Sequence, residues 1–568
     1  KTTDFDFRDY KNLKMYVHGE KSYKSDALKD DDLNVFVRLG SDFTNNYYEY
    51  EIPLKLTDWG TADPNAIWPE DNIMDIELAK LVNAKTLRNE LMNVPGSVIN
   101  TSNPFILPDG TDGKIKITVM GSPSLSDVRA MMIGVRNPKR NPKVFNTDDG
   151  QAKCAEVWVN ELRLTNFNEK SGWAANARMA TNLADLGNVM VSGAYSSPGF
   201  GSIEKKVNER QKEAISQFDV ATNLELGKFL PEKSGVRIPM HYDYSQTVSN
   251  PQYNPLDPDV LYSKQVEDMT KHQKDSLKLL TTDVTTRQNL NFMNVRKDRV
   301  GAAQKPQLWD VENFDVSYAY SEIKRHNNDI EEDSKKTYRG GLGYNFTVNP
   351  KNVKPFQKTV RSKSLAVIRD FNFYYLPKLL SFRTDMYRDY QKRLLRNKSG
   401  AQIIIEPTYT KQWDWNRIYD VKYDFSQSLK FDYSANVNAY ILEPPGGYEK
   451  QNSNYEQYRD TVWNSIKNFG STNRFNQMAN INYAVPFNKI RALNWVTLSA
   501  RYGVKYRWEA SPRSLQSRFG NTIENSRDIQ LNGGLRLTTL YDKVPFLKKA
   551  RIELQGKGQT QPGRMPGR

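Results

Sequence analysis

The sequence predicts an all-β protein in two parts: a β-sandwich or jelly-roll-like domain at residues 1–166, and long antiparallel hairpins of a transmembrane β-barrel at residues 167–568. Three observations predict this fold class. In the first part, short apolar segments alternate with turn clusters. In the second, apolar and polar residues alternate over segments longer than most soluble strands. No apolar run approaches the ~20 residues of a membrane helix, so only strands could cross a bilayer.

Six short strands are predicted in the first part, separated by turn clusters. They cover residues 11–18, 33–39, 47–54, 114–120, 128–135 and 154–164. A helix is predicted at residues 77–92, because Leu78, Leu81, Val82 and Leu91 fall roughly on one stripe. Cys154 is the single cysteine, which excludes a disulfide scaffold, and we expect it to be a small buried side chain.

Thirteen longer strands are predicted in the second part. They cover residues 172–181, 188–196, 215–228, 236–248, 286–296, 313–323, 337–348, 380–390, 403–425, 427–441, 475–483, 495–508 and 529–540, and another strand may start at Ala550. The clearest hairpin spans residues 471–508. Apolar residues take the odd positions from 475 to 485, except Gln477, and the even positions from 496 to 508. Such strands exceed the roughly 9–11 residues that cross a bilayer at a tilt.

Because side chains alternate faces along a strand, this hairpin predicts a lipid-facing side and a lumen-facing side. Aromatic side chains crowd the ends of the apolar side, as in the interfacial girdles of membrane barrels. The residues expected to face lipid are Ile481, Tyr483, Leu498, Tyr502 and Tyr506. Those expected to face the lumen are Asn480, Asn482, Ser499 and Arg501.

The connections between strands predict two different rims. If the chain zigzags, corners built on Pro231, Pro377, Pro486 and Pro545 fall on one rim, which we expect to be periplasmic. The opposite rim takes most of the long polar inserts, at residues 197–214, 249–285, 324–336, 442–474 and 509–527. The segment 349–379 departs from this asymmetry, because it is long but falls on the rim of short turns. By strand parity the domain at residues 1–166 lies on the long-loop side.

The composition argues against nucleic-acid binding and offers no sign of catalysis. The net charge is +15, but 81 basic residues are interleaved with 66 acidic ones, and no nucleic-acid-binding signature occurs. Phosphate-binding, dinucleotide-binding, zinc-protease and serine-hydrolase motifs are absent. The four histidines, His18, His241, His272 and His326, lack metal-ligand spacing. We therefore expect a non-enzyme with no catalytic, cofactor-binding or metal site.

Several longer motifs resemble one known family. They are AEVWVNELRL at residues 155–164, LPKLLSFRTDMYRDY at 376–390, the stretch 413–447 with SLKFDY and EPPGG, and YDKVPFLKK at 541–549. These are similar to the SprA/Sov family, the outer-membrane translocon of the Bacteroidota type IX secretion system.

The resemblance implies a single-chain barrel among the largest known, with surface-exposed loops, that passes folded cargo proteins carrying C-terminal sorting domains to the cell surface. It also implies a PorV-like shuttle barrel and a periplasmic plug protein as partners, besides outer-membrane lipid. Family members are several times longer, and this chain begins at Lys1 without a signal peptide, so we expect a fragment. Its strands would then form an open arc, with the strands near Gly172 and Ile529 unpaired to each other.

Two alternatives remain open at this point. One is an outer-membrane barrel of another export or uptake class, such as an usher or a receptor. The other is a soluble β-rich adhesin or glycan-binding protein led by residues 1–166. The soluble alternative requires both faces of the long strands to be covered by other protein. The translocon and the other outer-membrane barrels have the same kind of membrane wall, so the strands alone do not distinguish them.

Overall fold

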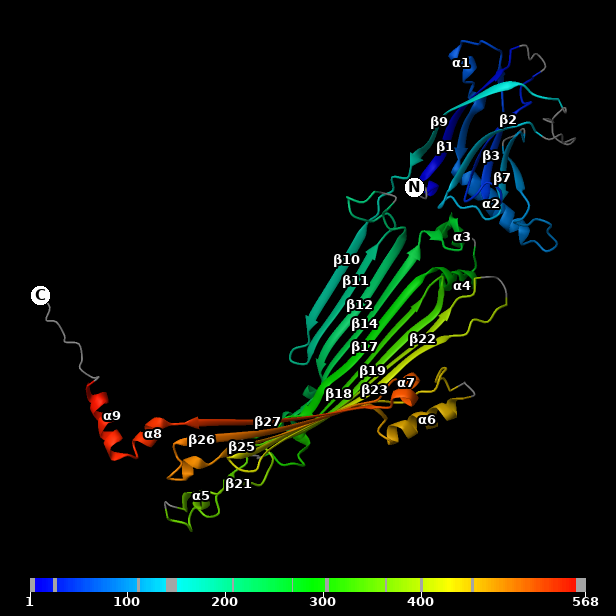
Figure 1. Ribbon diagram of the computed structural model, residues 1–568. Coiled ribbons are helices and arrows are strands. Elements are labelled where there is room, and N and C mark those ends of the chain that lie inside the picture. The colour runs from blue at the N-terminus through cyan, green and yellow to red at the C-terminus, as the bar shows by residue number, and fades with distance from the viewer. Residues whose placement is uncertain are drawn as a thin grey trace.

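The computed structural model describes residues 6–23, 28–109, 113–138, 151–206, 209–267, 269–301, 306–362, 365–398, 402–450 and 454–557 (Figure 1). Most of these residues lie in strands that pair in large antiparallel sheets, which confirms the all-β class. No helix in the described part of the chain is both long and apolar enough to span a membrane.

The N-terminal residues form two sheets that share one core. The five-stranded sheet has the order β6 (Phe105–Asp109), β7 (Ile115–Met120), β3 (Tyr47–Pro53), β2 (Asn34–Gly40) and β8 (Ala130–Arg136). In the second sheet, β1 (Tyr10–Lys21) pairs with β9 (Ala155–Phe167), β5 (Ile73–Glu77) and β4 (Leu56–Thr57). Two sheets of five and four strands make a sandwich, not the pair of four-stranded sheets of a jelly roll.

The core between these sheets is built from alternate residues of their strands. Leu13, Met15 and Val17 of β1 are buried together with Val35 and Val37 of β2. Helix α2 (Leu78–Met92) lies where its periodicity predicts it and adds Leu78, Leu81 and Ala84 to the same core. The short helix α1 (Pro64–Ile67) lies between β4 and β5.

The expectation that Cys154 is buried is wrong, because its side chain is exposed. Cys154 precedes the first residue of β9, so it is outside the alternating part of that strand. Its carbonyl still accepts a hydrogen bond from the backbone N–H of Ser22.

The second sheet system is one long sheet whose main strands follow chain order, each antiparallel to the next (Figure 1). In order they are β10 (Ala174–Asn182), β11 (Gly187–Ser196), β12 (Glu213–Glu225), β14 (Pro239–Pro251), β17 (Asp283–Lys297), β18 (Phe314–His326), β19 (Ile330–Thr347), β22 (Leu379–Leu395), β23 (Thr408–Asp424), β24 (Leu429–Tyr440), β25 (Ser471–Val485), β26 (Val496–Glu509) and β27 (Thr522–Leu535). The two-residue strand β13 (Val236–Arg237) pairs with β17.

One expected loop is strand instead. The polar segment 324–336 belongs mostly to β18 and β19, which turn through only residues 327–329. Its charges are matched across neighbouring strands, which stabilises strand pairing. Arg325 pairs with Asp283 at 2.6 Å, and Lys335 pairs with Asp389 at 3.0 Å.

Two expected strand positions are also wrong. β23 begins at Thr408 instead of residue 403, and β27 spans Thr522–Leu535 instead of 529–540. Helix α8 (Leu537–Tyr541) and helix α9 (Pro545–Lys557) replace the strand expected near Ala550. Pro545 at the first position of α9 favours a helix start, and Leu, Lys, Ala and Arg are good helix formers.

The connections divide the sheet edges into two rims. We call loop rim the edge that carries residues 197–212, 252–282, 327–329, 396–407, 441–470 and 510–521. It holds β15 (Tyr253–Asn254), β16 (Asp257–Leu261), α3 (Tyr262–Glu267), α4 (Lys271–Thr281), α6 (Tyr455–Lys467) and α7 (Arg513–Phe519).

We call proline rim the opposite edge, with the connections 183–186, 226–238, 298–313, 348–378, 425–428 and 486–495 and the segment after β27. It holds β20 (Asn352–Val353), β21 (Phe373–Tyr374) and α5 (Ala366–Arg369), besides α8 and α9. Pro231, Pro377, Pro486 and Pro545 all lie on this rim. The segments 298–313 and 348–378 are long, so loop length separates the two rims less sharply than expected.

The long sheet is open in the described part of the chain. β10 pairs only with β11, and β27 pairs only with β26, so the two strands are the ends of the strand order. Each therefore keeps one edge of unpaired backbone groups.

Candidate functional site

The register of β25 and β26 places the five expected lipid-facing residues on one face of the sheet. Ile481 lies opposite Tyr502, and the pair Gln477 and Tyr506 lies four residues away in register. Tyr483 faces Ala500, and Leu498 faces Val485. Residues directly opposite in an antiparallel pair point the same way. We call this side of the sheet the apolar face.

The apolar face continues across the sheet as rows of paired residues. One row contains Tyr423, Phe431, Ile481, Tyr502 and Ile529. Another contains Phe314, Tyr344, Phe382, Tyr419 and Ala435. Much of this face is uncovered, since Ile481 is 40% exposed, Tyr502 42% and Ile529 59%. An uncovered apolar surface of this extent marks an interaction with a membrane or another protein.

The four expected lumen residues lie on the opposite side, which we call the polar face. Asn482 lies opposite Arg501, and Arg501 donates a hydrogen bond to the side-chain oxygen of Asn480 at 3.2 Å. Ser499 is on the same side. Charged side chains of both signs lie on this face and form ion pairs. Arg474 and Glu509, for example, are 2.7 Å apart.

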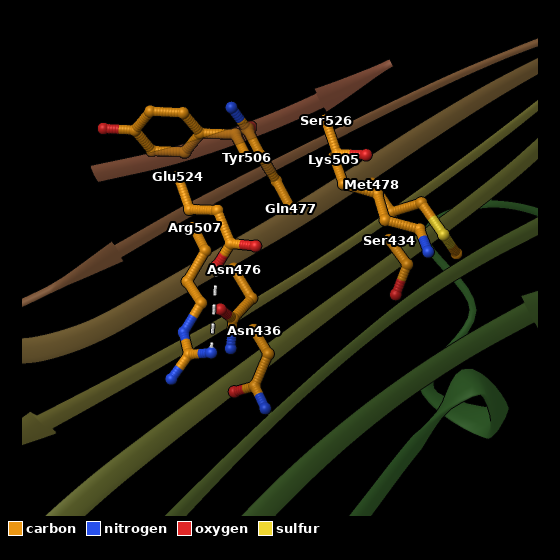
Figure 2. A pocket seen from close by; sticks show the side chains of 10 residues that line it. All are labelled: Ser434, Asn436, Asn476, Gln477, Met478, Lys505, Tyr506, Arg507, Glu524 and Ser526. Atoms are coloured by element: carbon orange, nitrogen blue, oxygen red, sulfur yellow. Dashed lines mark ion pairs between the residues drawn. The ribbon is translucent and has the colours of Figure 1, made fainter. Parts of the chain in front are cut away.

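The polar face holds an open groove of about 450 Å³ across β24 to β27 (Figure 2). Arg507 and Glu524 form an ion pair of 4.0 Å at one end, and Lys505 and Ser526 lie at the other. The remaining lining residues are Ser434, Asn436, Asn476 and Met478 on the same face, with Gln477 and Tyr506 of the apolar-face alternation beside them. Amide, hydroxyl and charged groups here suit a wetted surface more than a closed catalytic pocket.

A helix covers part of the apolar face, which the sequence did not predict. Tyr458 and Val462 of α6 form a small core with Ile441, packed against Trp413 and Trp415 of β23. The ring of Phe469, just after the helix, stacks on Trp415 at 5.7 Å between centroids. The connection 441–470 therefore leaves the loop rim and folds back onto the apolar face.

This connection supplies hydrogen-bond partners to two arginines that the strand alternation places on the apolar face. Arg388 lies opposite Trp413 and donates to Glu443 at 3.0 Å. Arg417 lies opposite Val437 and donates to the backbone carbonyl of Phe469 at 3.1 Å. A guanidinium left without a partner among apolar side chains would be costly.

Phe469, which partners Arg417, takes an unusual backbone conformation. Its φ is +59°, the left-handed region that bulky residues rarely occupy. The N–H of Gly470 closes the end of α6 on the carbonyl of Ser465 at 2.8 Å. Burial and a hydrogen bond to Glu443 raise the pKa of Tyr458, a loop residue that also contacts Arg388.

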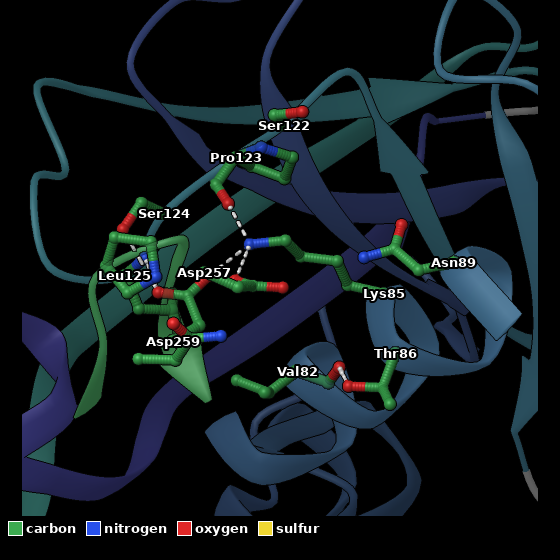
Figure 3. A network of polar contacts seen from close by, with 12 residues as sticks. Val82, Lys85, Thr86, Asn89, Ser122, Pro123, Ser124, Leu125, Asp257 and Asp259 are labelled. Carbon is green, nitrogen blue, oxygen red and sulfur yellow. Dashed lines mark hydrogen bonds and ion pairs between the residues drawn. The ribbon is translucent and has the colours of Figure 1, made fainter. Parts of the chain in front are cut away.

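A hairpin of the loop rim fixes the sandwich to the long sheet (Figure 3). Asp259 of β16 has a fully buried side chain and accepts four hydrogen bonds from the sandwich. The donors are Tyr48 Oη at 2.6 Å, Lys85 Nζ at 3.1 Å, Ser124 Oγ at 3.1 Å and the Leu125 N–H at 2.7 Å.

The donors around Asp259 are themselves held in place. Lys85 also reaches Asp257 at 2.7 Å and the carbonyl of Pro123 at 2.8 Å. Burial, reinforced by the charge of Asp259, raises the pKa of Tyr48 well above its usual value, so Tyr48 stays a neutral donor. Every side of this buried carboxylate is therefore matched, as buried charges require.

A second contact joins the sandwich to the same rim. Lys212, between β11 and β12, pairs with Asp6 and, at 3.2 Å, with Asp9. Arg8 donates to Asp6 and to the carbonyl of Pro258, both at 2.8 Å. Burial would raise the pKa of Asp6, but hydrogen bonds from Arg8 and Lys212 outweigh it and hold that pKa below the usual 3.8.

Possible metal ligands are scattered in the described part of the chain. The structure places His18 in β1, His241 in β14, His272 in α4 and His326 at the end of β18. Within the described ranges, no group of three or more His, Cys, Asp or Glu side chains is arranged to hold a metal ion.

Comparison with known families gives one match. Residues 1–266 match the family model SprA_N, described as motility related/secretion protein. The match covers the sandwich, the first strands of the long sheet and the hairpin that joins the two. The chain matches no curated protein.

Proposed function

We propose that the long sheet is part of the wall of a protein-conducting outer-membrane barrel, because residues 1–266 match a family model described as motility related/secretion protein. The barrel is the translocon of a type IX secretion system, and folded cargo proteins pass along its polar face to the cell surface.

The observation that carries this proposal is the two-sided sheet. Its apolar face repeats over successive strands of 9 to 18 residues and is largely uncovered. Lipid accepts an apolar surface, provided that the backbone polar groups are paired within the sheet. A soluble adhesin would need a second layer over that face, and α6 covers only the part near β23.

The polar face supports conduction more than catalysis. It carries amides, hydroxyls and charges of both signs, whereas a narrow ion-selective pore favours rings of one sign. The groove of Figure 2 is open and is lined by amides, hydroxyls and an ion pair of Arg507 with Glu524. We therefore propose a non-enzymatic role, with no cofactor.

The proposal includes further strands that complete the ring. The free edges of β10 and β27 would each expose a row of backbone N–H and C=O groups. In hydrocarbon each such group costs several kcal/mol, so membrane barrels leave no edge open. The proposed partners are secreted cargo with C-terminal sorting domains, a PorV-like shuttle barrel, a periplasmic plug protein and outer-membrane lipid, and no nucleic acid.

The two faces can be tested with nitroxide labels. In a Cys154→Ser background, Tyr502→Cys and Arg501→Cys place labels on neighbouring residues of opposite faces. We expect the label at 502 to collide with oxygen, which concentrates in lipid, and the label at 501 with a water-soluble nickel chelate. Equal accessibility to the nickel chelate at both positions would contradict the membrane wall.

An outer-membrane barrel of another export or uptake class would share these faces. A secretion assay distinguishes a translocon from such a barrel. If the chain is part of a translocon, its deletion should abolish export of cargo with C-terminal sorting domains. Uninterrupted export in such a deletion strain would favour the usher or receptor class.

A further inference from the structure

The proline rim carries a cluster of exposed apolar side chains. Within the connection 348–378, Phe371 is 52% exposed, Tyr375 70% and Ile368 50%. Phe356 and Val367 are exposed as well. Single exposed apolar side chains are ordinary, but a group within one connection marks an interaction surface.

The same connection is strongly basic. Between Asn349 and Lys378 the chain has seven basic residues and one acidic residue, Asp370. The loop rim is closer to balance, since its six connections together have 15 basic and 13 acidic residues. The positive charge is therefore concentrated at one edge of the sheet.

Hydrogen bonds hold this connection against the neighbouring turns of the rim. Tyr423 Oη donates to the carbonyl of Tyr374 at 2.8 Å, and the Gln427 N–H donates to Asn372 Oδ1 at 2.8 Å. Lys489, from the next turn, donates to the carbonyl of Asp370 at 3.1 Å. The aromatic rings thus have a defined place on the rim.

The apolar face runs directly into this cluster. Tyr423 belongs to the same row as Ile481 and Tyr502. Its ring meets Phe425 at 4.5 Å, and Phe373 meets Tyr375 at 4.8 Å. The hydrogen bond from Tyr423 to the Tyr374 carbonyl joins the apolar face to this cluster.

Some other connections of the proline rim repeat the same combination, whereas 298–313 has two basic and three acidic residues. Phe229, beside Pro231, is 72% exposed, and Phe546, beside Pro545, is 77% exposed. The segment 536–552 has five basic residues and one acidic residue, and 486–495 has two basic and no acidic residues. The proline corners thus share a chemistry as well as a position.

We propose that the proline rim binds the anionic headgroups of a phospholipid leaflet, with its aromatic rings at the interface and its lysines and arginines on the phosphates. This proposal rests on the proposed function, which places the apolar face in lipid. Aromatic rings prefer the membrane interface, and basic residues beside it are attracted to anionic lipid. The exposed side chains of Lys351, Lys358 and Arg361 are in no ion pair recorded within the described residues.

The test measures which lipid lies next to the rim. The complete barrel, including the further strands that close its ring, carries Cys154→Ser, Thr359→Cys and a bimane at position 359, and is reconstituted in phosphatidylcholine vesicles containing phosphatidylglycerol. Two samples are compared: in one the phosphatidylglycerol is brominated, and in the other the phosphatidylcholine. Bromine quenches only a nearby fluorophore, so the quenching reports which lipid lies beside position 359. We expect brominated phosphatidylglycerol to quench more than brominated phosphatidylcholine at equal mole fraction.

The charge dependence is tested with two matched variants. Lys351→Gln/Lys358→Gln/Arg361→Gln should lower the preference for phosphatidylglycerol at least about five-fold, since each basic residue near the surface contributes about that factor. Lys264→Gln/Lys271→Gln/Lys278→Gln removes the same charge from the loop rim and should leave the preference unchanged. Lys358→Gln alone serves if the triple variant does not assemble.

A bimane at Leu531→Cys, on the apolar face, separates the two proposals. Quenching at 531 without quenching at 359 would overturn lipid binding by the rim and leave the wall intact, as expected if a protein covers the rim. Equal quenching by both lipids at 359 would also overturn it. Absence of quenching at 531 would contradict the proposed function itself, because the apolar face would then not contact lipid.

Discussion

At the scale of single residues, parity along a strand decides the environment of each side chain. Ile481 and Asn482 are neighbours in sequence and lie on opposite faces, because the side-chain period of a strand is two. The same rule puts Arg388 and Arg417 on the apolar face, where Glu443 and the carbonyl of Phe469 meet their charges. The connection 441–470 thus supplies partners to two arginines on this face.

Replacing Tyr502 by arginine should destabilise the protein in a bilayer by roughly 2–4 kcal/mol, as for a charge on the lipid face of a barrel. Tyr502 lies in the middle of β26 and has no covering segment that could meet the new charge. Unfolding in urea from lipid vesicles measures the change. The control is Ser499→Arg, on the polar face, which should cost little; an equal loss in both variants would refute the assignment of faces.

Acid should weaken the contact between the sandwich and the loop rim through Asp6. Its pKa in the folded protein is below the usual 3.8, so its ionised form is stabilised by folding. This stabilisation is complete above about pH 4, near the pKa of an unfolded aspartate, and is lost as the pH falls through the lower folded value. Hydrogen exchange of residues 10–21 as a function of pH should show the loss. Asp6→Asn should remove that acid-dependent step, and an unchanged pH profile would contradict the assignment.

At the scale of elements, connections do more than join strands. The hairpin of β15 and β16 inserts Asp259 into the sandwich, and α6 folds onto the apolar face. Both connections place a buried carboxylate beside a cation: Asp259 beside Lys85, and Glu443 beside Arg388. The loop rim is therefore a structured part of the molecule.

Asp259→Asn should loosen the sandwich from the long sheet by about 1–3 kcal/mol, the cost of leaving buried donors poorly matched. Lys85 would keep Asp257 but lose its second carboxylate. Protease cleavage between residues 168 and 172, followed by release of the sandwich on heating, measures the effect. Asp329→Asn on the same rim breaks only the exposed pair with Lys398 and should change stability by less than about 0.5 kcal/mol. Equal release in both variants would contradict the role of Asp259.

Arg388→Met should detach α6 from the apolar face. It leaves Glu443, which is 4% exposed, without its cation, and breaking a buried pair in this way costs roughly 3–5 kcal/mol. We expect faster proteolysis within residues 441–470, with the long sheet otherwise intact. Arg459→Met, which breaks an exposed pair with Asp460 on the same helix, is the control. Unchanged proteolysis in Arg388→Met would show that the aromatic contacts alone hold the helix.

At the scale of the whole molecule, the two rims give the long sheet a direction. The sandwich, α3, α4, α6 and α7 are at the loop rim, and the four proline corners are at the other. The basic and aromatic residues of the connection 348–378 also lie at the proline rim. We expect the loop rim to face the outside of the cell.

Protease added to intact cells tests this direction. If the loop rim is outside, cleavage should occur in the sandwich or within residues 250–274 before the outer membrane is broken. The exposed connection 348–378 on the proline rim should be cut only after the membrane is broken. The reverse order would invert the topology.

The sequence by itself determined the all-β class, the positions of most long strands and the shared side of Ile481, Tyr483, Leu498, Tyr502 and Tyr506, because alternation and proline corners are local properties of the chain. Only the tertiary structure decided that residues 324–336 pair as strand, that Cys154 is exposed, and that residues after Pro545 form a helix. It also decided the burial of Asp259 and the cover that Glu443 and Phe469 give to two arginines. These features depend on partners far away in sequence, since a charged residue joins a strand or a buried site only when an opposite group from another segment meets it.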